Sequence, residues 1–503
     1  MTAPQPAFAD VLLHRLCDHA ERRPGGIAVL DDRERVTTVQ LLHRVAVLAH
    51  AVRERAPGGS RVGICLQPGV AQHVALLATL VASCTYVPLD AAWSPERTAF
   101  ICADAELELV IAEPGSAPVG ALTLAPSALD GTSGAAPIDS LTFPIAHDCA
   151  VYVMYTSGTT GVPKGVETGW PALRNRLDWM QALYPLDADD VVATKASCGF
   201  DVSIWEHLWP ALAGASVAGL SVVRLGGWSG MYRAMDEMGV TVTHLVPSVA
   251  RALLDDPAVG VLPRLRFVAL SGEVLDLFTA DRVQRMAPEA AIYNMYGPTE
   301  CAIDVSYWRH RTGSSADPVP IGAGAPACRL TLRPVGGSES PVPYELVISG
   351  VQVAAGYIGA AGGTGGFTEL PGLGPSYITG DRVVRVHPGG FSVLGRMDRQ
   401  TKINGVRTEL DGIEAAVRMH PSVLGCAAVT QMIDGRPAVV VAYVRRDDQP
   451  EVSGRELTTF VRTHTAMESV LLRAFELPLI PLTVTGKTDY AAVEMRTRAE
   501  VQA

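Results

Sequence analysis

The segment Thr156-Ser157-Gly158-Thr159-Thr160-Gly161-Val162-Pro163-Lys164-Gly165 is rich in small residues and follows the strand-like run 150–155. Small residues let backbone N–H groups and hydroxyls close around an oligophosphate, and Lys164 adds a positive charge. The spacing of a Walker A motif is absent. The segment therefore predicts a phosphate-binding loop of another type. An ordinary flexible turn is the alternative, and the Pro-Lys-Gly ending argues against it.

Outward from this segment, apolar β-branched runs alternate with helix-like patterns between about residues 24 and 395. The strand-like runs are 61–66, 84–89, 191–194, 240–245 and 267–270, and the clearest helix-like pattern is 71–82. Such alternation predicts an α/β fold of several layers, with parallel strands buried on both faces.

The pattern changes after Arg396. Helix-like segments at 409–419 and 454–463 enclose strand-like runs at 426–430 and 438–444, which predicts a small α+β domain. We expect a large domain over residues 1–396 and a small, mobile domain over residues 397–503, with the boundary near Asp398.

Composition excludes several classes of protein. The 503 residues carry 41 Lys+Arg and 52 Asp+Glu, a net charge of −11, with 48% hydrophobic residues. This balance excludes a disordered chain and a nucleic-acid binder driven by bulk charge. The nine cysteines form no Cys-x-x-Cys pair, which predicts reduced thiols in a cytoplasm. The N-terminus lacks a secretory pattern and no run is long enough to cross a bilayer, so we expect no membrane association.

Four more motifs follow the glycine-rich segment in a fixed order. They are Asn294-Met295-Tyr296-Gly297-Pro298-Thr299-Glu300, Tyr377-Ile378-Thr379-Gly380-Asp381, Gly395-Arg396-Met397-Asp398-Arg399-Gln400-Thr401-Lys402 and Thr485-Gly486-Lys487. With this order and spacing the chain resembles the adenylate-forming superfamily, most closely the amino-acid adenylation domains of non-ribosomal peptide synthetases. The resemblance covers nearly the whole chain.

The resemblance implies a reaction in which a carboxylate attacks the α-phosphate of ATP. Glu300 is expected to bind Mg²⁺, while Lys487 contacts the substrate carboxylate and the phosphate and Lys164 contacts phosphate. Asp398 is expected to be the hinge between the two domains. The residues implied to bind the nucleotide are Thr156, Ser157, Gly158, Thr159, Thr160, Gly161, Gly272, Asn294, Tyr296, Gly297, Thr299, Asp381 and Arg396. Without the resemblance, Glu300 is an ordinary surface acid, Asp381 a turn residue and Tyr296 a core aromatic.

The same resemblance implies a substrate pocket. Its matching positions are Asp201, Val202, Trp205, His244, Ala269, Ser271, Met295, Ile303, Asp304 and Lys487. Asp201 is expected to bind an α-ammonium, so the substrate is an amino acid. His244, Ser271 and Asp304 favour a short side chain with a hydroxyl, as in serine. Ala269 replaces a bulkier residue, which leaves open a longer β-substituted alanine.

Two alternative functions and two possible protein partners accompany this interpretation. A carboxylate–CoA ligase acting on a small hydroxy or aryl acid and a catalytically inactive scaffold are the alternatives. Because 16 residues follow Lys487, we expect a carrier protein in trans to accept the amino acid on its phosphopantetheine thiol. The need for a small MbtH-like helper protein stays open. The string Leu225-Gly226-Gly227-Trp228-Ser229 resembles a pantetheine-bearing serine, but it lies inside the predicted α/β region, so we do not expect modification there.

Overall fold

The structure is a computed structural model that describes residues 7–115, 123–125, 149–156, 162–334, 344–359, 365–386, 390–397, 399–403, 406–446, 449–464, 471–482 and 488–502. The described residues fall into two compact units. The first unit contains residues from 1–91, 102–154 and 165–395, and the second contains residues from 92–101, 155–164 and 396–503.

A long sheet of the first unit carries three of the predicted pocket positions, His244, Ala269 and Met295. Its strands, in spatial order, are β15 (Ala323–Gly324), β14 (Ser306–Arg309), β13 (Ala291–Tyr296), β12 (Phe267–Leu270), β11 (Val242–Leu245), β9 (Val191–Thr194), β10 (Ser216–Gly219), β1 (Ile27–Leu30) and β2 (Arg35–Thr37). The strands from β13 to β1 pair in parallel. Strands β10, β11 and β12 are buried along their whole length, as parallel strands covered on both faces require.

Two further sheets complete the strand layers of the first unit. One contains, in order, β18 (Gly356–Ile358), β8 (Lys164–Gly169), β7 (Ala150–Thr156), β4 (Thr85–Pro88), β3 (Arg61–Cys65), β5 (Leu109–Ala112) and β6 (Thr123–Leu124). The other contains β16 (Cys328–Pro334), β17 (Tyr344–Gly350), β20 (Gly374–Val386) and β19 (Phe367–Leu370), with β21 (Gly390–Arg396) beside β20.

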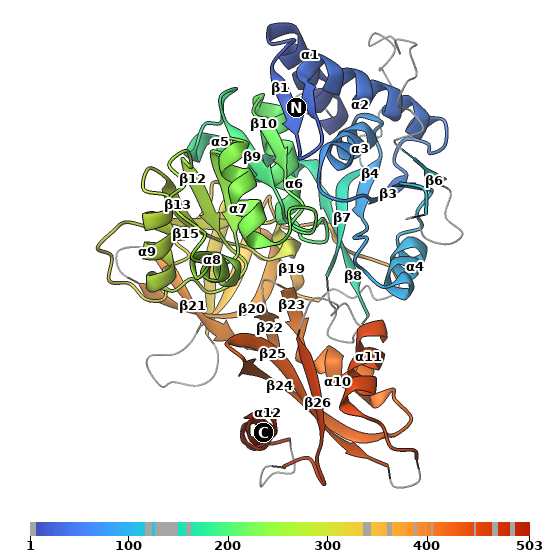
Figure 1. Ribbon diagram of the computed structural model, residues 1–503, viewed down its shortest axis with the longest axis vertical. Helices are drawn as coiled ribbons and strands as arrows, with labels where there is room; N and C mark the ends of the chain where they lie inside the picture. Colours follow the sequence, from blue (N-terminus) through green and yellow to red (C-terminus); the bar gives the residue numbers. More distant parts are fainter. Residues whose placement is uncertain are drawn as a thin grey trace. The chain divides into compact units, whose positions relative to one another are not determined.

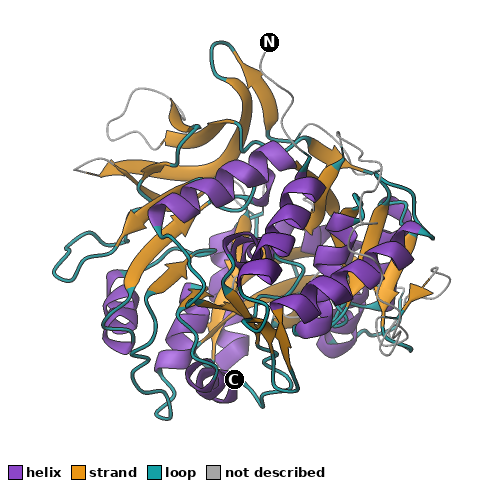
Figure 2. Ribbon diagram, turned by 90° about the horizontal axis from the view of Figure 1, so that it is seen from above, coloured by secondary structure: helices purple, strands orange, loops and turns teal. Residues whose placement is uncertain are grey.

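Helices cover the sheets of the first unit. They are α1 (Phe8–Arg22), α2 (Thr38–Arg53), α3 (Val70–Val81), α4 (Pro95–Asp104), α5 (Trp170–Leu183), α6 (Val202–Ala213), α7 (Trp228–Glu237), α8 (Pro247–Leu254) and α9 (Leu277–Met286), of which α4 is shared with the second unit. Figure 2 shows these helices running alongside the strand layers. One apolar cluster joins α1, α2, α3, α5 and α6 to the strands, and its members include the predicted pocket residues Ala269, Met295 and Ile303. The pocket positions are therefore continuous with the core.

The second unit is a small α+β assembly. It contains β22 (Gln400–Ile403), β23 (Val406–Glu409), α10 (Leu410–Arg418), β24 (Val423–Ile433), β25 (Arg436–Arg445), α11 (Gly454–His464), β26 (Leu472–Glu476) and α12 (Tyr490–Gln502). Alternate residues of β24 and β25 face opposite sides of their sheet. One side packs on Val417 of α10 and Leu457 of α11, and the other packs on Val493 of α12 (Figure 1).

These elements confirm the α/β class and most of the predicted segments. Strands β9 and β12 have the expected bounds, and α3 and α10 differ from the expected helices by one residue at each end. Ser229 lies in the first turn of α7, where its hydroxyl donates a hydrogen bond to Asp256, so this string is the start of a helix. All nine cysteines are free thiols. Among the helices that the structure describes, none has both the length and the apolarity to span a membrane.

Candidate functional site

Three neighbouring parallel strands bring predicted pocket residues to one edge of the long sheet. His244 lies in β11, Ser271 directly follows β12 and Met295 lies in β13. Strand pairing places Ala269 of β12 beside His244. Carboxyl ends of parallel strands are the usual ligand-binding edge of such sheets, because there the chain turns away and leaves room.

The first turn of α6 supplies three more pocket positions. Asp201 is the residue before the helix, Val202 begins it and Trp205 is fully buried. The Trp205 ring lies edge-on to the His244 ring, with 6.3 Å between their centres. Asp201 interacts electrostatically with the buried Arg176. The helix start and the strand edge thus contribute to one buried cluster.

His244 is a neutral hydrogen-bonding group in this cluster. Its Nε2 lies 2.9 Å from the Ser271 hydroxyl. Burial lowers the pKa of His244 well below its usual range, and the charges of Lys195 and Arg176 lower it further. The other ring nitrogen, Nδ1, is buried and has no hydrogen-bond partner among the described residues. A buried polar atom left unpaired is costly, so a ligand hydroxyl that pairs with it would be favoured.

Arg176 of α5 is a pocket residue that the motifs did not indicate. It is fully buried and its Nη2 lies 2.6 Å from Oδ2 of Asp304, a predicted substrate-binding residue. Nη2 also lies 3.9 Å from the sulfur of Met295, and the guanidinium stacks over the Trp179 ring at 4.4 Å. Burial lowers the pKa of Arg176, while the charge of Asp304 and their hydrogen bond oppose this. An arginine stays protonated under these conditions, so the two side chains form a buried ion pair.

A signal for Arg176 was present in the sequence. Leu173, Leu177 and Met180 recur at the spacing of one helix face, and Arg176 interrupts that face. An arginine on an otherwise apolar stripe indicates a buried partner of opposite charge. Nothing in the local pattern identifies Asp304, 128 residues away, as that partner.

The turn that carries Ile303 and Asp304 is held in a rare backbone conformation. Ala302 and Ile303 both have positive φ, 54° and 81°, and a β-branched residue seldom adopts such values. The buried amide of Gln352 donates hydrogen bonds to the carbonyls of Cys301, Ala302 and Asp304 at 2.9–3.3 Å. Gln352 therefore fixes this turn, and its role was also missed, because no motif surrounds it.

Gln352 is itself oriented by two donors from α5. Its Oε1 accepts hydrogen bonds from the Trp179 indole at 3.0 Å and from the Asn175 amide at 2.8 Å. The turn, Gln352 and α5 thus form one network that places Asp304 against Arg176. Gly297 is required beside this network, since a Cβ there would lie 2.2 Å from the Ile303 carbonyl oxygen.

Three predicted site residues of the first unit take part in two hydrogen-bonded pairs. Glu300, the predicted magnesium ligand, belongs to one pair, and Tyr296 and Asp381, predicted to bind the nucleotide, form the other. The Tyr357 hydroxyl donates to Oε1 of Glu300 at 2.7 Å, and Glu300 is fully buried just after β13. The Tyr296 hydroxyl donates to Asp381. Tyr296 is therefore coupled to Asp381 in this structure and is partly buried against the apolar clusters of the third sheet.

Three other predicted nucleotide residues have mainly backbone roles here. The Asn294 amide donates to the carbonyls of Val319 and Pro320 at 3.0 and 2.9 Å, which fixes the chain beside β13. Gly272 has a positive φ of 92°, and Thr299 begins a short 3₁₀ helix ahead of Glu300. None of these positions contradicts its prediction, and their contact with a nucleotide stays a prediction.

The remaining predicted residues belong to the second unit or lie outside the described residues. Thr156 ends β7, Lys164 begins β8 and Arg396 ends β21, all in the second unit. Those outside the described residues are Ser157, Gly158, Thr159, Thr160, Gly161, Asp398 and Lys487.

Sequence comparison identifies the family. The AMP-binding enzyme family matches residues 16–358, two thirds of the chain. The chain belongs to this family. It is also 33% identical to enterobactin synthase component F of Escherichia coli, over 98% of this chain and 40% of that protein. The phosphinothricin tripeptide synthetase PhsB of Streptomyces viridochromogenes is 34% identical, over 96% of this chain and 42% of that protein. The chain thus spans about two fifths of the length of these curated relatives.

Solved structures share the fold. The adenylation domain AlmE of Vibrio cholerae, in complex with glycyl-adenosine-5'-phosphate, superimposes with a TM-score of 0.81 at 20% identity, covering 99% of each chain. PA1221, described as a protein with adenylation and PCP domains, gives 0.80 at 24% identity, covering 96% of this chain and 84% of that one. The likeness to the adenylate-forming superfamily and its α/β fold, with a large N-terminal and a smaller C-terminal domain, are confirmed.

Proposed function

We propose that this member of the AMP-binding enzymes activates an amino acid with a short hydroxylated side chain, serine first, as its aminoacyl-AMP. The observation that carries the proposal is the unpaired, buried Nδ1 of a neutral His244 whose other nitrogen is held by Ser271. A serine hydroxyl can donate to this nitrogen. A longer β-substituted alanine remains the second choice because Ala269, beside His244, is small.

The first half-reaction joins two anions, since a carboxylate attacks the α-phosphate of ATP while pyrophosphate leaves. Asp201 binds the α-ammonium of the amino acid and so orients its carboxylate. Lys487 and Lys164 supply positive charge at the carboxylate and the phosphates, and the charge of Lys487 gains most as the transition state forms. Asp381 accepts hydrogen bonds from the ribose, and Tyr296, which pairs with Asp381, lies against adenine.

Glu300 fits a magnesium ion. It offers a hard carboxylate, fully buried and oriented by the Tyr357 hydroxyl. Protein Mg²⁺ sites commonly use one or two carboxylates together with substrate phosphates and water. When bound, the ion would neutralise phosphate charge. Within the chain, Tyr357 holds one oxygen of Glu300 and the 3₁₀ turn fixes its backbone.

The second half-reaction would transfer the aminoacyl group to the phosphopantetheine thiol of a carrier protein, with the small domain turning at Asp398. PA1221 contains adenylation and PCP domains, and another solved structure is an artificially fused adenylation–PCP di-domain. Both support a carrier protein as the partner. Transfer to coenzyme A instead is the outcome that would favour the carboxylate–CoA ligase alternative.

Amino-acid-dependent ATP–pyrophosphate exchange tests the proposal. The panel contains serine, alanine, threonine, 2,3-diaminopropionate and O-acylated and O-carbamoylated serines. A site that hydrogen-bonds a hydroxyl rejects the analogue without one by up to about 10⁴-fold, so alanine should be a poor substrate. If alanine or valine is activated faster than every hydroxylated candidate, the hydroxyl role of His244 is wrong.

The catalytic assignment has its own test. Lys487→Ala should lower the exchange rate by about 10²–10³ while ATP binding changes little, because its charge acts mainly on the transition state. Lys402→Ala, at another of the four lysines, is the matched control and should retain exchange. Wild-type exchange in Lys487→Ala would contradict the assignment and favour an inactive or differently organised site.

A further inference from the structure

We infer that Arg176 determines substrate specificity by neutralising Asp304, so that the pocket accepts an uncharged side chain and rejects a cationic one. Without Arg176, Asp304 would be a buried carboxylate facing the substrate side chain, a natural partner for an ammonium group. With Arg176 at 2.6 Å, that charge is already balanced. The inference rests on the proposed function and specifies the class of substrate for the same site.

The ionic groups of this cluster support a charge count. Its carboxylates are Asp201, Asp304 and Glu206, and its cations are Arg176 and Lys195. His244 is neutral, so three negative and two positive groups leave a net charge of −1. Among the described residues, an amino acid with an uncharged side chain leaves this count unchanged, because its α-ammonium and α-carboxylate cancel. A cationic or anionic side chain would change the count beside an Asp304 that Arg176 already neutralises.

Lys195 and Glu206 form the second buried pair in this count. The Lys195 ammonium lies 4.0 Å from Glu206, whose Oε2 accepts the backbone N–H groups of Lys195 and Ala196 at 3.0 Å. Both side chains are almost fully buried. The charge of Lys195 balances that of Glu206 at this distance, although Oε1 of Glu206 has no hydrogen-bond partner among the described residues.

The ion pair of Arg176 and Asp304 is shielded from water and held in place by its surroundings. Neither Arg176 nor Asp304 is exposed by more than 4%, and Gln352 fixes the backbone of Asp304 through its carbonyl. The Arg176 Nε has no hydrogen-bond partner among the described residues, so the guanidinium is not fully satisfied by the fold alone. An arginine held for structure only would gain from a complete set of partners.

Exchange with three substrates of equal size class tests the inference: serine, 2,3-diaminopropionate and aspartate. Arg176→Met should raise the activity with diaminopropionate relative to serine by at least about tenfold, because Asp304 becomes an unpaired carboxylate. Asp304→Asn should instead raise the activity with aspartate relative to serine, because Arg176 becomes unpaired. The double variant Arg176→Met/Asp304→Asn should return both ratios toward wild type.

Arg176→Lys is the conservative control and should keep the wild-type ratio at reduced rate. Each variant is measured by its ratio of activities at equal substrate concentrations, which a general loss of folded protein leaves unchanged. If Arg176→Met does not fold, Asp304→Asn and the double variant decide the question. An unchanged aspartate-to-serine ratio in Asp304→Asn, together with an unchanged diaminopropionate-to-serine ratio wherever Arg176→Met folds, would overturn the inference. A wild-type enzyme inactive with every hydroxylated amino acid would instead overturn the proposed function.

Discussion

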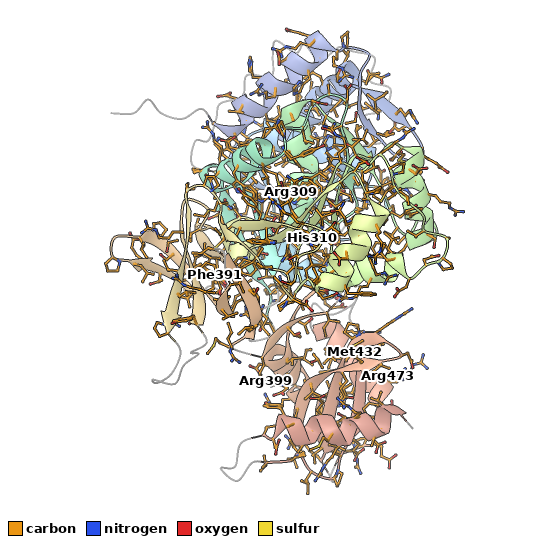
Figure 3. All side chains as sticks on the ribbon, turned by 90° about the vertical axis from the view of Figure 1, so that its left-hand side faces the viewer. Arg309, His310, Phe391, Arg399, Met432 and Arg473 are labelled. Carbon is orange, nitrogen blue, oxygen red and sulfur yellow. The ribbon has the colours of Figure 1, made fainter. Side chains whose placement is uncertain are left out.

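Two arginines, the fully buried Arg176 and the half-buried Arg399, organise the two units of this chain in different ways. Arg176, in the first unit, pairs with one carboxylate and leaves its Nε unpaired among the described residues. Arg399, in the second unit, contacts Asp411 at 2.6 Å, Glu414 at 2.7 Å and the Tyr490 hydroxyl at 2.8 Å. It also donates to the Ala428 carbonyl and stacks on Tyr490, with 3.7 Å between the guanidinium carbon and the ring centre. Arg399 is labelled in Figure 3.

The difference separates a structural arginine from the arginine that we propose to serve a ligand. Arg399 connects β22, α10, β24 and α12, so its hydrogen bonds replace part of the apolar core that a small domain lacks. Arg176 contacts Asp304 and Met295, two positions predicted to contact the substrate, besides Trp179 and Met180 of its own helix. A ligand bound beside Asp304 would lie next to a guanidinium that the described residues satisfy only in part.

The largest expected effect comes from Arg399. Arg399→Met should destabilise the second unit by about 3 kcal/mol, because the almost fully buried Glu414 keeps only Arg418 of its two arginine partners and the other hydrogen bonds of Arg399 are lost as well. The pair keeps some solvent contact through Arg399, which is 23% exposed, so the value lies at the low end for buried pairs. Urea unfolding, followed by a signal from the second unit, measures the change in the free energy of unfolding. The ratio of the exchange activity with serine to that with diaminopropionate should not change.

The matched control is Arg445→Met in the same unit. Arg445 pairs with the exposed Glu476 at 3.3 Å, and such surface pairs contribute at most about 1 kcal/mol. If both variants lose equal stability, the Arg399 cluster is no more structural than a surface pair. If Arg399→Met also changes the substrate ratio, the contrast with Arg176 fails.

A second effect concerns buried imidazoles that carry no charge. His73 of α3 and His207 of α6 face each other with their Nδ1 atoms 3.0 Å apart. Burial lowers the pKa of His207 from 6.5 to about 4, and that of His73 is lowered by burial and by its neighbour. The unfolded chain thus binds more protons between pH 6.5 and 4, so stability falls as pH falls through this window.

The size of this loss follows from the shift at His207. Lowering the pKa of His207 from 6.5 in the unfolded chain to about 4 in the folded chain corresponds to a loss of roughly 3 kcal/mol in the free energy of unfolding between pH 7 and pH 4. His207→Gln keeps a hydrogen-bonding group but cannot titrate, so its stability should fall by less over the same range. Urea unfolding at pH 7, 5.5 and 4.5 gives the slope. Parallel slopes for wild type and variant would show that this pair does not titrate on unfolding.

The contrast between the two units also shows how far sequence reasoning reached. Buried parallel strands such as β9 and β12 were predictable, because their short, largely apolar runs alternate with helix-like patterns along the chain. The resemblance indicated His244, Ser271 and Asp304 as pocket positions, and their contact with a substrate stays a prediction. Arg176 and Gln352 were not, since their partners are more than 45 residues away and their own segments look like an amphipathic helix and a loop. The strained Ile303 turn was invisible for the same reason, because long-range hydrogen bonds hold it.

The smallest effect tests how much space the pocket has. Ala269 is 1% exposed and lies between His244 and Tyr293 in the sheet. Ala269→Leu adds three carbons. If a cavity lies beside His244, leucine should fill it with little loss of stability. The ratio of the exchange activity with serine to that with O-substituted serines should then rise by about tenfold. If the site is already full, the same substitution should cost about 1–3 kcal/mol through overpacking.

Ala280→Leu, on the buried side of α9, is the overpacking control. Thermal unfolding together with exchange on serine and O-acylserine separates the outcomes: sharper selectivity at unchanged stability places the spare volume where a longer substrate would reach, whereas lost stability with unchanged selectivity assigns the pocket to serine itself.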